Sequence, residues 1–279
     1  MKTFNGKVAA ITGAGSGIGR AIALNLAEQG CDLALSDVDK KGLKSTADQA
    51  RKIGAEVSES LLDVADRDAV FQWADQVVAD HGHVDVVFNN AGVAMSGTVA
   101  GHSIEDYEWI MNINFWGVIY GTKAFLPHLE KRGGHVVNIS SIFGLTSQPF
   151  MSGYNASKFA VRGFTEALRQ DLEITGSSVS CTCVHPGGIK TNIAKSSRMS
   201  DSMKGVTGMT KEQASAKFEK MFIHTPEKAA KTILDGVLKN KRRVLIGADA
   251  RFFDIAVRLA PTGYQKLFTK ATQWMNKAG

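Results

Sequence analysis

Tyr154 and Lys158 are the residues of this chain whose types and spacing best fit acid–base chemistry. They lie four positions apart in 153–176, a segment predicted to be helical, so their side chains share one helix face about 6 Å apart. A phenol alone is a poor base, because its pKa is about 10. An ammonium group at that distance favours the phenolate by about 3 kcal/mol, or about two pKa units. The pair could then exchange a proton with an alcohol, although a core aromatic beside a solvated lysine would show the same spacing.

A glycine-rich turn follows the first predicted strand, an apolar run at 7–12. Its spacing is G-x-x-x-G-x-G, and a helix predicted to extend to Gln29 follows it. Glycines let the backbone approach a pyrophosphate closely, and a helix N-terminus offers free N–H groups to phosphates. Between a strand and a helix, the turn favours dinucleotide binding over a plain tight connection. The predicted contacts are Gly13, Ser16, Gly17, Ile18 and Gly19.

Asp37 ends the next predicted strand, 32–37. A carboxylate here accepts hydrogen bonds from the adenosine ribose hydroxyls and repels a 2′-phosphate. Val38 follows it and Ser16 occupies the glycine turn, so neither position offers a positive charge to such a phosphate. We therefore predict NAD rather than NADP as the cofactor. Capping of the following helix, together with Asp39, is an alternative role, and both roles could hold.

Strands and helices alternate along the rest of the chain, which predicts an α/β fold with a doubly wound parallel sheet in a three-layer sandwich. Ligands of such sheets bind at the carboxyl ends of the strands, where Asp63 could bond an adenine or begin a turn. A third predicted strand ends at Val64, and the remaining ones span 85–92, 134–141, 178–185 and 243–248. The other predicted helices span 40–53, 66–80, 103–129 and 225–240.

Asn114 and the segment 189–224 are two further features that could serve a functional site. Asn114 falls inside the long predicted helix 103–129, where asparagine is unfavourable, so we expect it to have a polar task. The segment 189–224 is rich in methionine and phenylalanine, at Met199, Met203, Met209, Phe218, Met221 and Phe222. We predict that it is a mobile lid or binding loop of the same domain, 1–248.

Residues 4–248 resemble a classical short-chain dehydrogenase/reductase. The resemblance rests on several motifs in order: Thr12-Gly13…Gly17-Ile18-Gly19, Asn89-Asn90-Ala91-Gly92, Asn114, Ser141, Tyr154…Lys158 and Pro186-Gly187. It implies a Rossmann-type sheet of about seven strands and a homodimer or homotetramer.

The resemblance also implies roles for individual residues. Tyr154 would be the acid/base, Lys158 would lower its pKa and hold the nicotinamide ribose, and Ser141, rather than the adjacent Ser140, would bond the substrate oxygen. Asn114 would hold a water that links Lys158 to solvent. The further cofactor contacts would be Asp63, Val64, Asn90, Ala91, Gly92, Pro186, Gly187, Ile189 and Thr191.

The predicted function is hydride transfer between NAD and a secondary alcohol or ketone. Apolar residues surround the predicted site, at Ile142, Phe143, Leu145, Phe150 and Met151. We therefore expect a bulky lipophilic substrate, with a small diol as the alternative. An NADPH-dependent carbonyl reductase of the same fold and a non-catalytic dinucleotide-binding sensor are the rival functions.

The positive charge of the chain lies in its last part. The net charge is +6, and the residues from Lys239 onward carry nine Lys or Arg and two Asp, so the preceding residues sum to about −1. This distribution argues against a nucleic-acid groove across the domain. Residues 249–279 are predicted to be a basic amphipathic helical tail that packs on the body or on a second subunit, or that touches an anionic membrane. Its predicted apolar stripe is Tyr264, Leu267, Phe268, Ala271, Trp274 and Met275.

The cysteines and histidines suggest no metal site. Cys31, Cys181 and Cys183 are expected to be buried thiols in a reducing compartment. No apolar run approaches the roughly 20 residues that span a bilayer, and a strand begins directly after Met1–Gly6. We therefore expect a cytoplasmic protein, with membrane association through the tail as an alternative.

Overall fold

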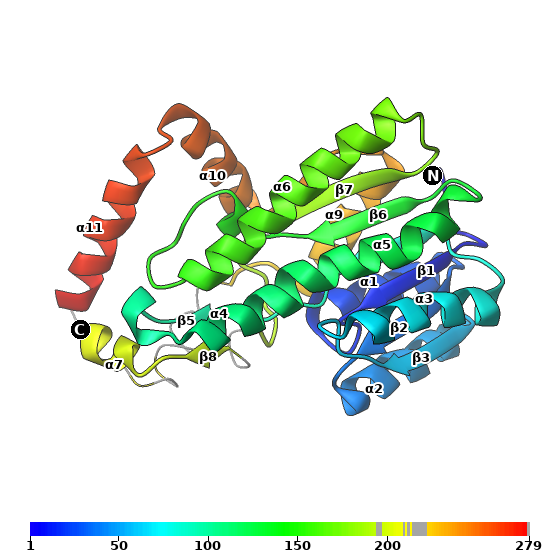
Figure 1. The fold of residues 1–279 in the computed structure, drawn as a ribbon, viewed down its shortest axis with the longest axis horizontal. Coiled ribbons are helices and arrows are strands. Elements are labelled where there is room, and N and C mark those ends of the chain that lie inside the picture. The colour runs from blue at the N-terminus through cyan, green and yellow to red at the C-terminus, as the bar shows by residue number, and fades with distance from the viewer. Residues whose placement is uncertain (194–196, 209, 211–212, 214–221, 278–279) are drawn as a thin grey trace.

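A seven-stranded parallel sheet forms the centre of the computed structural model, which describes residues 1–193, 197–208, 210, 213 and 222–277 (Figure 1). The strand order is β3-β2-β1-β4-β6-β7-β9. The order reverses between β1 and β4, and a ligand crevice is expected at the carboxyl ends of strands at such a point. The doubly wound prediction is confirmed. The strands are β1 (Val8–Thr12), β2 (Asp32–Asp37), β3 (Val57–Leu61), β4 (Val86–Asn89), β6 (His135–Ile139), β7 (Ser180–Pro186) and β9 (Arg243–Ile246).

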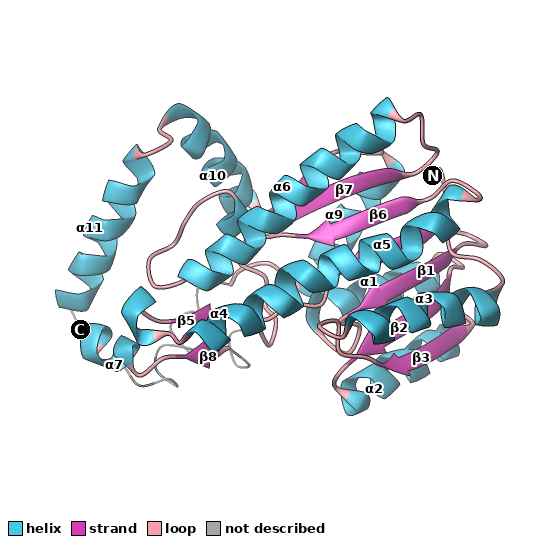
Figure 2. Ribbon diagram, viewed as in Figure 1, coloured by secondary structure: helices cyan, strands magenta, loops and turns pink. Residues whose placement is uncertain are grey.

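Helices cover both faces of the sheet, as Figure 2 shows. Alternate residues of each strand face opposite sides, so Ala9 and Ile11 of β1 join one apolar core while Ala10 joins the other. The first core is closed by α1 (Gly17–Glu28), α2 (Lys40–Ile53) and α9 (Pro226–Leu238). The second is closed by α3 (Arg67–His81), α5 (Gly117–Glu130) and α6 (Ser152–Ile174).

The starts of the helices follow the capping residues in the sequence. Asp39 accepts a hydrogen bond from the backbone of α2, and Asp66 does the same for α3. Thr225 caps α9, whose first residue is Pro226. Each side chain satisfies a backbone N–H that the first helical turn leaves unpaired, which fixes where the helix begins.

The long predicted helix 103–129 is in fact interrupted. Ser103 and Asp106 form the capping box of α4 (Ile104–Met111), but the π-helical segment η2 (Asn112–Trp116) separates α4 from α5. This segment carries Asn114, whose fully buried side chain bonds another part of the chain. A π segment accommodates one extra residue per turn and is often found at functional sites. Helical periodicity alone did not reveal it.

The remaining elements lie beyond the carboxyl edge of the sheet. In the 189–224 segment, β8 (Arg198–Met199) pairs with β5 (Met95–Ser96), and α7 (Ser202–Thr207) follows. Met209, Phe218 and Met221 lie outside the described residues. The tail forms α10 (Ala248–Leu259) and α11 (Gly263–Lys277), and α11 extends away from the sheet (Figure 1). The short helices are η1 (Val99–Gly101) and η3 (Ile142–Gly144).

All three cysteines are buried, as predicted. Among the helices of the described ranges, none combines the length and apolar character needed to cross a bilayer.

Candidate active site

Tyr154 and Lys158 meet on α6 as their spacing predicted. The Lys158 ammonium lies 5.7 Å from the centre of the Tyr154 ring, and both side chains are buried. The Lys158 Nζ donates a hydrogen bond to the carbonyl of Ile139 at the end of β6, with an N···O distance of 3.0 Å. This bond fixes the lysine against the carboxyl edge of the sheet and leaves further Nζ hydrogens for other partners.

The pKa of Tyr154 moves in the opposite direction from the one predicted. Burial raises it from 10 to about 12, while a hydrogen bond with Ser141 opposes the rise. Burial also lowers the pKa of Lys158 from 10.5 to about 8. The expected lowering of the Tyr154 pKa by Lys158 was therefore wrong for the protein without ligand. Removal of each group from water disfavours its charged form, and this burial is the largest cause of both shifts.

The structure distinguishes the two neighbouring serines. The Ser140 hydroxyl donates to the main-chain carbonyl of Lys158 at 2.8 Å, so Ser140 ties β6 to the helix that carries the tyrosine. The Ser141 side chain hydrogen-bonds Tyr154 and accepts the N–H of Phe143 at 3.1 Å. Ser141 is thus the serine beside the acid/base candidate, and its predicted contact with the substrate oxygen stays a prediction.

Asn114 is held in a complete hydrogen-bond set. Its Oδ1 accepts the N–H of Val93 at 2.8 Å, and its Nδ2 donates to the Val93 carbonyl at 2.9 Å and to the Ser157 hydroxyl at 3.0 Å. A Cβ atom on Gly92 would lie 3.2 Å from Asn114 Oδ1 and 3.3 Å from Lys158 Nζ. Asn114, Gly92 and Lys158 therefore surround one small space. Both amide hydrogens of Asn114 are used, so a water at this residue could donate only to its oxygens.

The glycine turn leaves space that side chains would fill. Gly13 and Gly17 have φ values of +66° and +53°, which favour glycine. A Cβ on Gly19 would lie 2.1 Å from the Gly13 carbonyl oxygen. Ser16 is the N-cap residue of α1 and makes no side-chain capping bond. The turn, the helix N-terminus and this close packing fit a dinucleotide pyrophosphate.

Thr12, Arg20 and Thr46 support this turn, and of these only Thr12 belongs to a motif found in the sequence. The Thr12 hydroxyl accepts the N–H groups of Asn90 and Ala91, each at 3.0 Å. Arg20 donates to the carbonyl of Gly15 and, at 2.9 Å, to the hydroxyl of Thr46. Thr46 in turn donates to the Ala14 carbonyl at 2.9 Å. No local pattern marks Thr46 as a partner, because it lies on α2, far along the chain.

Asn90, the residue directly after β4, faces the same turn. Its Nδ2 donates to the carbonyls of Thr12 at 2.8 Å and Gly13 at 3.2 Å. The side chain thus holds the glycine turn in place. The predicted contact of Asn90 with the cofactor ribose stays a prediction, and this bonding gives Asn90 a structural task as well.

The acidic residues at the strand ends differ in their partners. Asp37 accepts the N–H of Gly15 and of Asp39, each at 2.8 Å, whereas Asp39 itself caps α2. Asp37 therefore joins the end of β2 to the glycine turn and does not cap the helix. Asp63 is exposed and accepts the N–H of Ala65 at 2.9 Å, so it begins a turn. Its predicted contact with adenine, like the contact predicted for Val64, stays untested.

The residues after β7 approach the glycine turn from the other side. Thr191 lies so close that a Cβ on Gly17 would be 3.0 Å from its Cγ2. Ile189 is buried and pairs with His224, which brings the two ends of the 189–224 segment together. Gly187 packs against Asp249, and a Cβ there would lie 2.2 Å from a carboxylate oxygen. The predicted positions Gly13, Gly17, Asp37 and Thr191 thus lie around the glycine turn, at the strand edge where a ligand crevice is expected.

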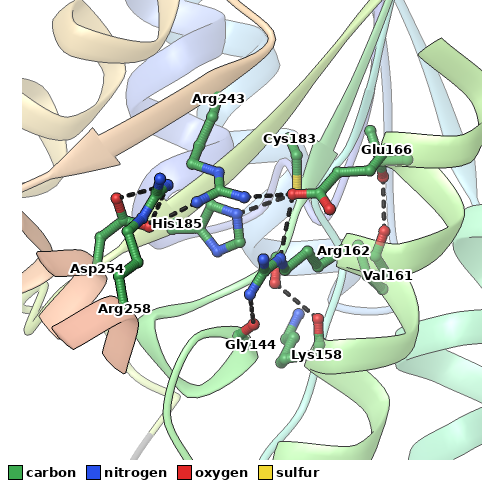
Figure 3. A network of polar contacts seen from close by, with 12 residues as sticks. Gly144, Lys158, Val161, Arg162, Glu166, Cys183, His185, Arg243, Asp254 and Arg258 are labelled. Atoms are coloured by element: carbon green, nitrogen blue, oxygen red, sulfur yellow. Dashed lines mark hydrogen bonds and ion pairs between the residues drawn. The ribbon is translucent and has the colours of Figure 1, made fainter. Parts of the chain in front are cut away.

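A buried histidine, also missed from the sequence, lies behind the serine. His185 on β7 donates from Nδ1 to the main-chain carbonyl of Ser141 at 2.9 Å, and its Nε2 lies 3.3 Å from the Cys183 sulfur. Burial lowers the pKa of His185 to about 4, so the ring is neutral. Figure 3 shows it beside an ionic network in which Arg243 contacts both Glu166 and Asp254.

Apolar side chains surround the Tyr154 ring. Phe143 contacts it edge to face, with ring centres 6.0 Å apart, and Met151 belongs to the same buried cluster as Met95 and Ile110. Phe150 does not share this position. It lines a surface cavity of about 480 Å³ with Ala156 and Phe159, which lie on a different face of α6 from the acid/base pair. Its expected place at the substrate site is therefore not supported.

Comparisons with known proteins agree with this architecture. The family model of short chain dehydrogenases matches residues 7–202, and the chain belongs to that family. It is 51% identical to the putative oxidoreductase SadH of Mycobacterium tuberculosis over 270 residues, which cover 96% of this chain and 95% of that protein. It is 31% identical to the human estradiol 17-beta-dehydrogenase 11 over 264 residues, or 93% of this chain and 81% of that protein.

A solved structure gives a similar result. The crystal structure of a short chain dehydrogenase/reductase from Burkholderia phymatum in complex with NAD superimposes with a TM-score of 0.83, at 34% identity. The match covers 93% of this chain and 96% of that one. This chain is therefore an oxidoreductase of the short-chain dehydrogenase/reductase family, whose members bind a nicotinamide cofactor.

Proposed function

We propose that this protein is an NAD-dependent dehydrogenase that interconverts a bulky, lipophilic secondary alcohol and its ketone. The observation that carries the proposal is the position of the Tyr154 hydroxyl: it is hydrogen-bonded to Ser141, buried among apolar side chains and close to Lys158. A phenol in this setting can exchange a proton with a substrate oxygen that the serine also contacts.

The proposed roles divide the chemistry between the protein and its cofactor. NAD, when bound in the crevice beside the glycine turn, accepts or donates the hydride. Ser141 holds the substrate oxygen, and Tyr154 takes the hydroxyl proton during oxidation or returns it during reduction. With a pKa of about 12, Tyr154 is a neutral acid near pH 7, ready to protonate a developing alkoxide.

Lys158 assists both directions of this proton transfer. Its pKa of about 8 leaves it mostly charged near pH 7. An ammonium group 5.7 Å from the Tyr154 ring stabilises a phenolate while oxidation proceeds. Asn114, which borders the same space as Lys158, would accept a water there and so link the lysine to solvent.

Asp37 supports NAD rather than NADP. Its carboxylate lies at the end of β2 and is tied to the glycine turn through the Gly15 N–H. A fixed negative charge at this place would bond ribose hydroxyls and repel a 2′-phosphate.

Replacement of Asp37 by Asn keeps the shape of the side chain and removes its charge. Asp37→Asn should therefore narrow the preference for NAD over NADP by tenfold or more, an effect of about 1.4 kcal/mol. Equal affinities of the wild-type protein for both cofactors would contradict this assignment.

The lipophilic substrate is supported by the surroundings of Tyr154. Partly buried Phe143 packs on its ring beside the apolar cluster that contains Met95 and Met151, and burial of apolar surface stabilises a complex by about 25 cal/mol per Å². NADH formation should therefore be measured with secondary alcohols of increasing apolar size, with Tyr154→Phe as the blank. We expect kcat/KM to rise with size and activity to vanish in the variant.

The same experiment separates the alternatives. Turnover of small hydrophilic diols alone would retain the chemistry but contradict the lipophilic site. Turnover that persists in Tyr154→Phe would contradict the role of the tyrosine. A protein that binds NAD but oxidises nothing, and reduces none of the matching ketones, would favour a dinucleotide sensor.

A further inference from the structure

The final helix, α11, exposes large apolar side chains. Leu267 is 63% exposed and Trp274 is 70% exposed, and the last residue of α10, Leu259, is 81% exposed. Among Tyr264, Leu267, Phe268, Ala271 and Trp274, the stripe residues whose side chains the structure describes, only Tyr264 and Phe268 are half-buried. A 15-residue helix that buries so little is marginally stable by itself. Some further surface is needed to cover it.

Lysines border this apolar surface. At about 100° per residue, Leu267 and Trp274 lie about 20° apart around α11, and Lys270 lies about 40° from Trp274. Lys266 and Lys270 are exposed, and residues 263–277 contain no Asp or Glu. We call Lys266, Leu267, Lys270 and Trp274 the tail face. Apolar residues beside lysines can enter a lipid interface while the ammonium groups reach the headgroups.

Several contacts hold the tail face at a defined position. Phe253 of α10 packs on Phe268 with ring centres 5.6 Å apart, and Tyr264 packs on Phe268 with ring centres 5.5 Å apart. The Tyr264 hydroxyl accepts the N–H of Ser147 at 3.1 Å, which anchors α11 to the loop between Ser141 and Tyr154. The tail face is thus presented by the body and is not a free peptide.

Ion pairs anchor α10 in the same way. Asp254 of α10 bonds Arg243 of β9 at 2.5 Å, and Arg243 also contacts Glu166 of α6 (Figure 3). Arg258 adds a further pair with Asp254 at 3.1 Å. Asp254 of α10 is thus paired with arginines of the same chain, whereas Lys266 and Lys270 of α11 are exposed.

We propose that the tail face binds peripherally to an anionic lipid surface. The distribution of charge along the chain favours a lipid surface over a second copy of the chain as the partner. Residues 263–277 carry three Lys and no acidic residue, whereas residues 1–238 sum to about −1 and therefore offer a second copy little opposite charge. Anionic lipids supply that charge over a whole surface, and the lipid interface accepts Leu267 and Trp274.

The test is flotation of the full chain with two kinds of vesicle. One contains phosphatidylcholine alone, and the other contains equimolar phosphatidylcholine and phosphatidylglycerol. We expect binding to the anionic vesicles only, with a decrease as salt is added. Lys266→Glu/Lys270→Glu should lower the partition coefficient on the order of tenfold or more. Leu267→Glu/Trp274→Glu should lower it to a similar extent, because it removes the apolar contact.

A matched control separates the tail face from total charge. Lys52→Glu/Lys231→Glu makes the same change in net charge at two exposed lysines outside the tail. We expect this variant to bind nearly as well as the wild-type protein. An equal loss of binding in the control would overturn the proposal, and so would the failure of the wild-type protein to float with anionic vesicles.

Sedimentation velocity tests the second copy as the occupant. The tail-face variants should sediment as the wild-type protein does, because the exposed positions contribute no subunit contact. A smaller assembly in Leu267→Glu/Trp274→Glu would show that the tail face is covered by another subunit, and the lipid proposal would be wrong.

Discussion

The edge of the sheet that borders the crevice and the C-terminal helices differ in how their polar and apolar groups are satisfied. At the crevice, Asn114 uses both amide hydrogens, and the Thr12 hydroxyl accepts two backbone N–H groups. At the other end of the chain, Leu267 and Trp274 have most of their surface in solvent. In the first region Asn114 and Thr12 make their hydrogen bonds within the chain, whereas the second leaves apolar surface uncovered.

This difference separates two kinds of binding. A crevice whose backbone is already fixed loses little conformational freedom when a cofactor enters, so more of the contact energy appears as affinity. A surface with uncovered apolar groups gains its stability from whatever covers it. Changes at the crevice should therefore affect stability and cofactor binding together, and changes at the tail should affect neither strongly.

The largest effect is expected from Gly19→Ala. The added Cβ would lie 2.1 Å from the Gly13 carbonyl oxygen and 2.6 Å from Asn90 Nδ2, so the turn must move. We expect a loss of about 3 kcal/mol in the free energy of unfolding and a fall of at least a hundredfold in NAD affinity. Urea denaturation and fluorescence titration with NADH measure the two quantities.

Gly163→Ala is the matched control for this change. Gly163 lies inside α6, and no atom comes within 4 Å of a Cβ placed there. Alanine in a helix interior should raise the free energy of unfolding by about 0.5–1 kcal/mol and leave NADH binding unchanged. If Gly19→Ala behaved like this control, the close packing of the turn would be irrelevant to binding.

Acid should destabilise the buried sheet through two histidines. Burial lowers the pKa of His185 to about 4 and that of His135 to about 3, from 6.5. The unfolded chain therefore binds more protons below pH 6.5, and the free energy of unfolding falls as the pH drops toward 4. The loss is on the order of 3 kcal/mol for His185 over this interval.

Urea denaturation at a series of pH values measures the slope, and the double variant His135→Gln/His185→Asn should flatten it. The hydrogen bond from His135 Nε2 to the Thr182 hydroxyl, at 2.8 Å, can be kept by the glutamine amide. An unchanged slope in the double variant would mean that other groups titrate, since neither histidine would then account for the acid sensitivity.

A smaller effect, on kcat near neutral pH, is expected from changes at His185. Its side chain hydrogen-bonds the main-chain carbonyl of Ser141. The amide of Asn can reach the place of Nδ1, whereas the amide of Gln replaces Nε2. His185→Gln should lower kcat about five- to tenfold with little change in KM, because the loss of one buried hydrogen bond shifts Ser141. His185→Asn should restore kcat. If both variants lost activity equally, His185 would act through packing alone.

The sequence could predict those parts of the site that depend on one element or on the end of a strand. The spacing of Tyr154 and Lys158 follows from helix geometry, and Asp37 and Ser141 follow predicted strands. The carboxyl ends of parallel strands share one edge, so the approximate meeting of these residues could be foreseen. The doubly wound fold followed in the same way from the alternation of strands and helices.

The features that were missed depend on contacts between distant segments. Arg20, Thr46 and His185 support the site from elements far apart in the chain, and no local pattern marks them. The π segment carries Asn114, whose side chain bonds the distant backbone of Val93. The direction of the Tyr154 pKa shift was also missed, because spacing gives the charge interaction but not the cost of burial.

The smallest effect is expected from the removal of α11. A chain that ends at Ala260 loses the Tyr264 bond to Ser147 and the packing on Phe253, but Leu267 and Trp274 contribute little buried surface. The free energy of unfolding should fall by less than about 1.5 kcal/mol, which is the range of one hydrogen bond and one aromatic contact. Tyr264→Phe in the full chain removes the hydrogen bond to Ser147 and should reproduce most of that bond's share of the loss in the free energy of unfolding. Urea denaturation of both proteins gives the comparison, and a loss of several kcal/mol on truncation would mean that α11 is as much a part of the folded core as the crevice.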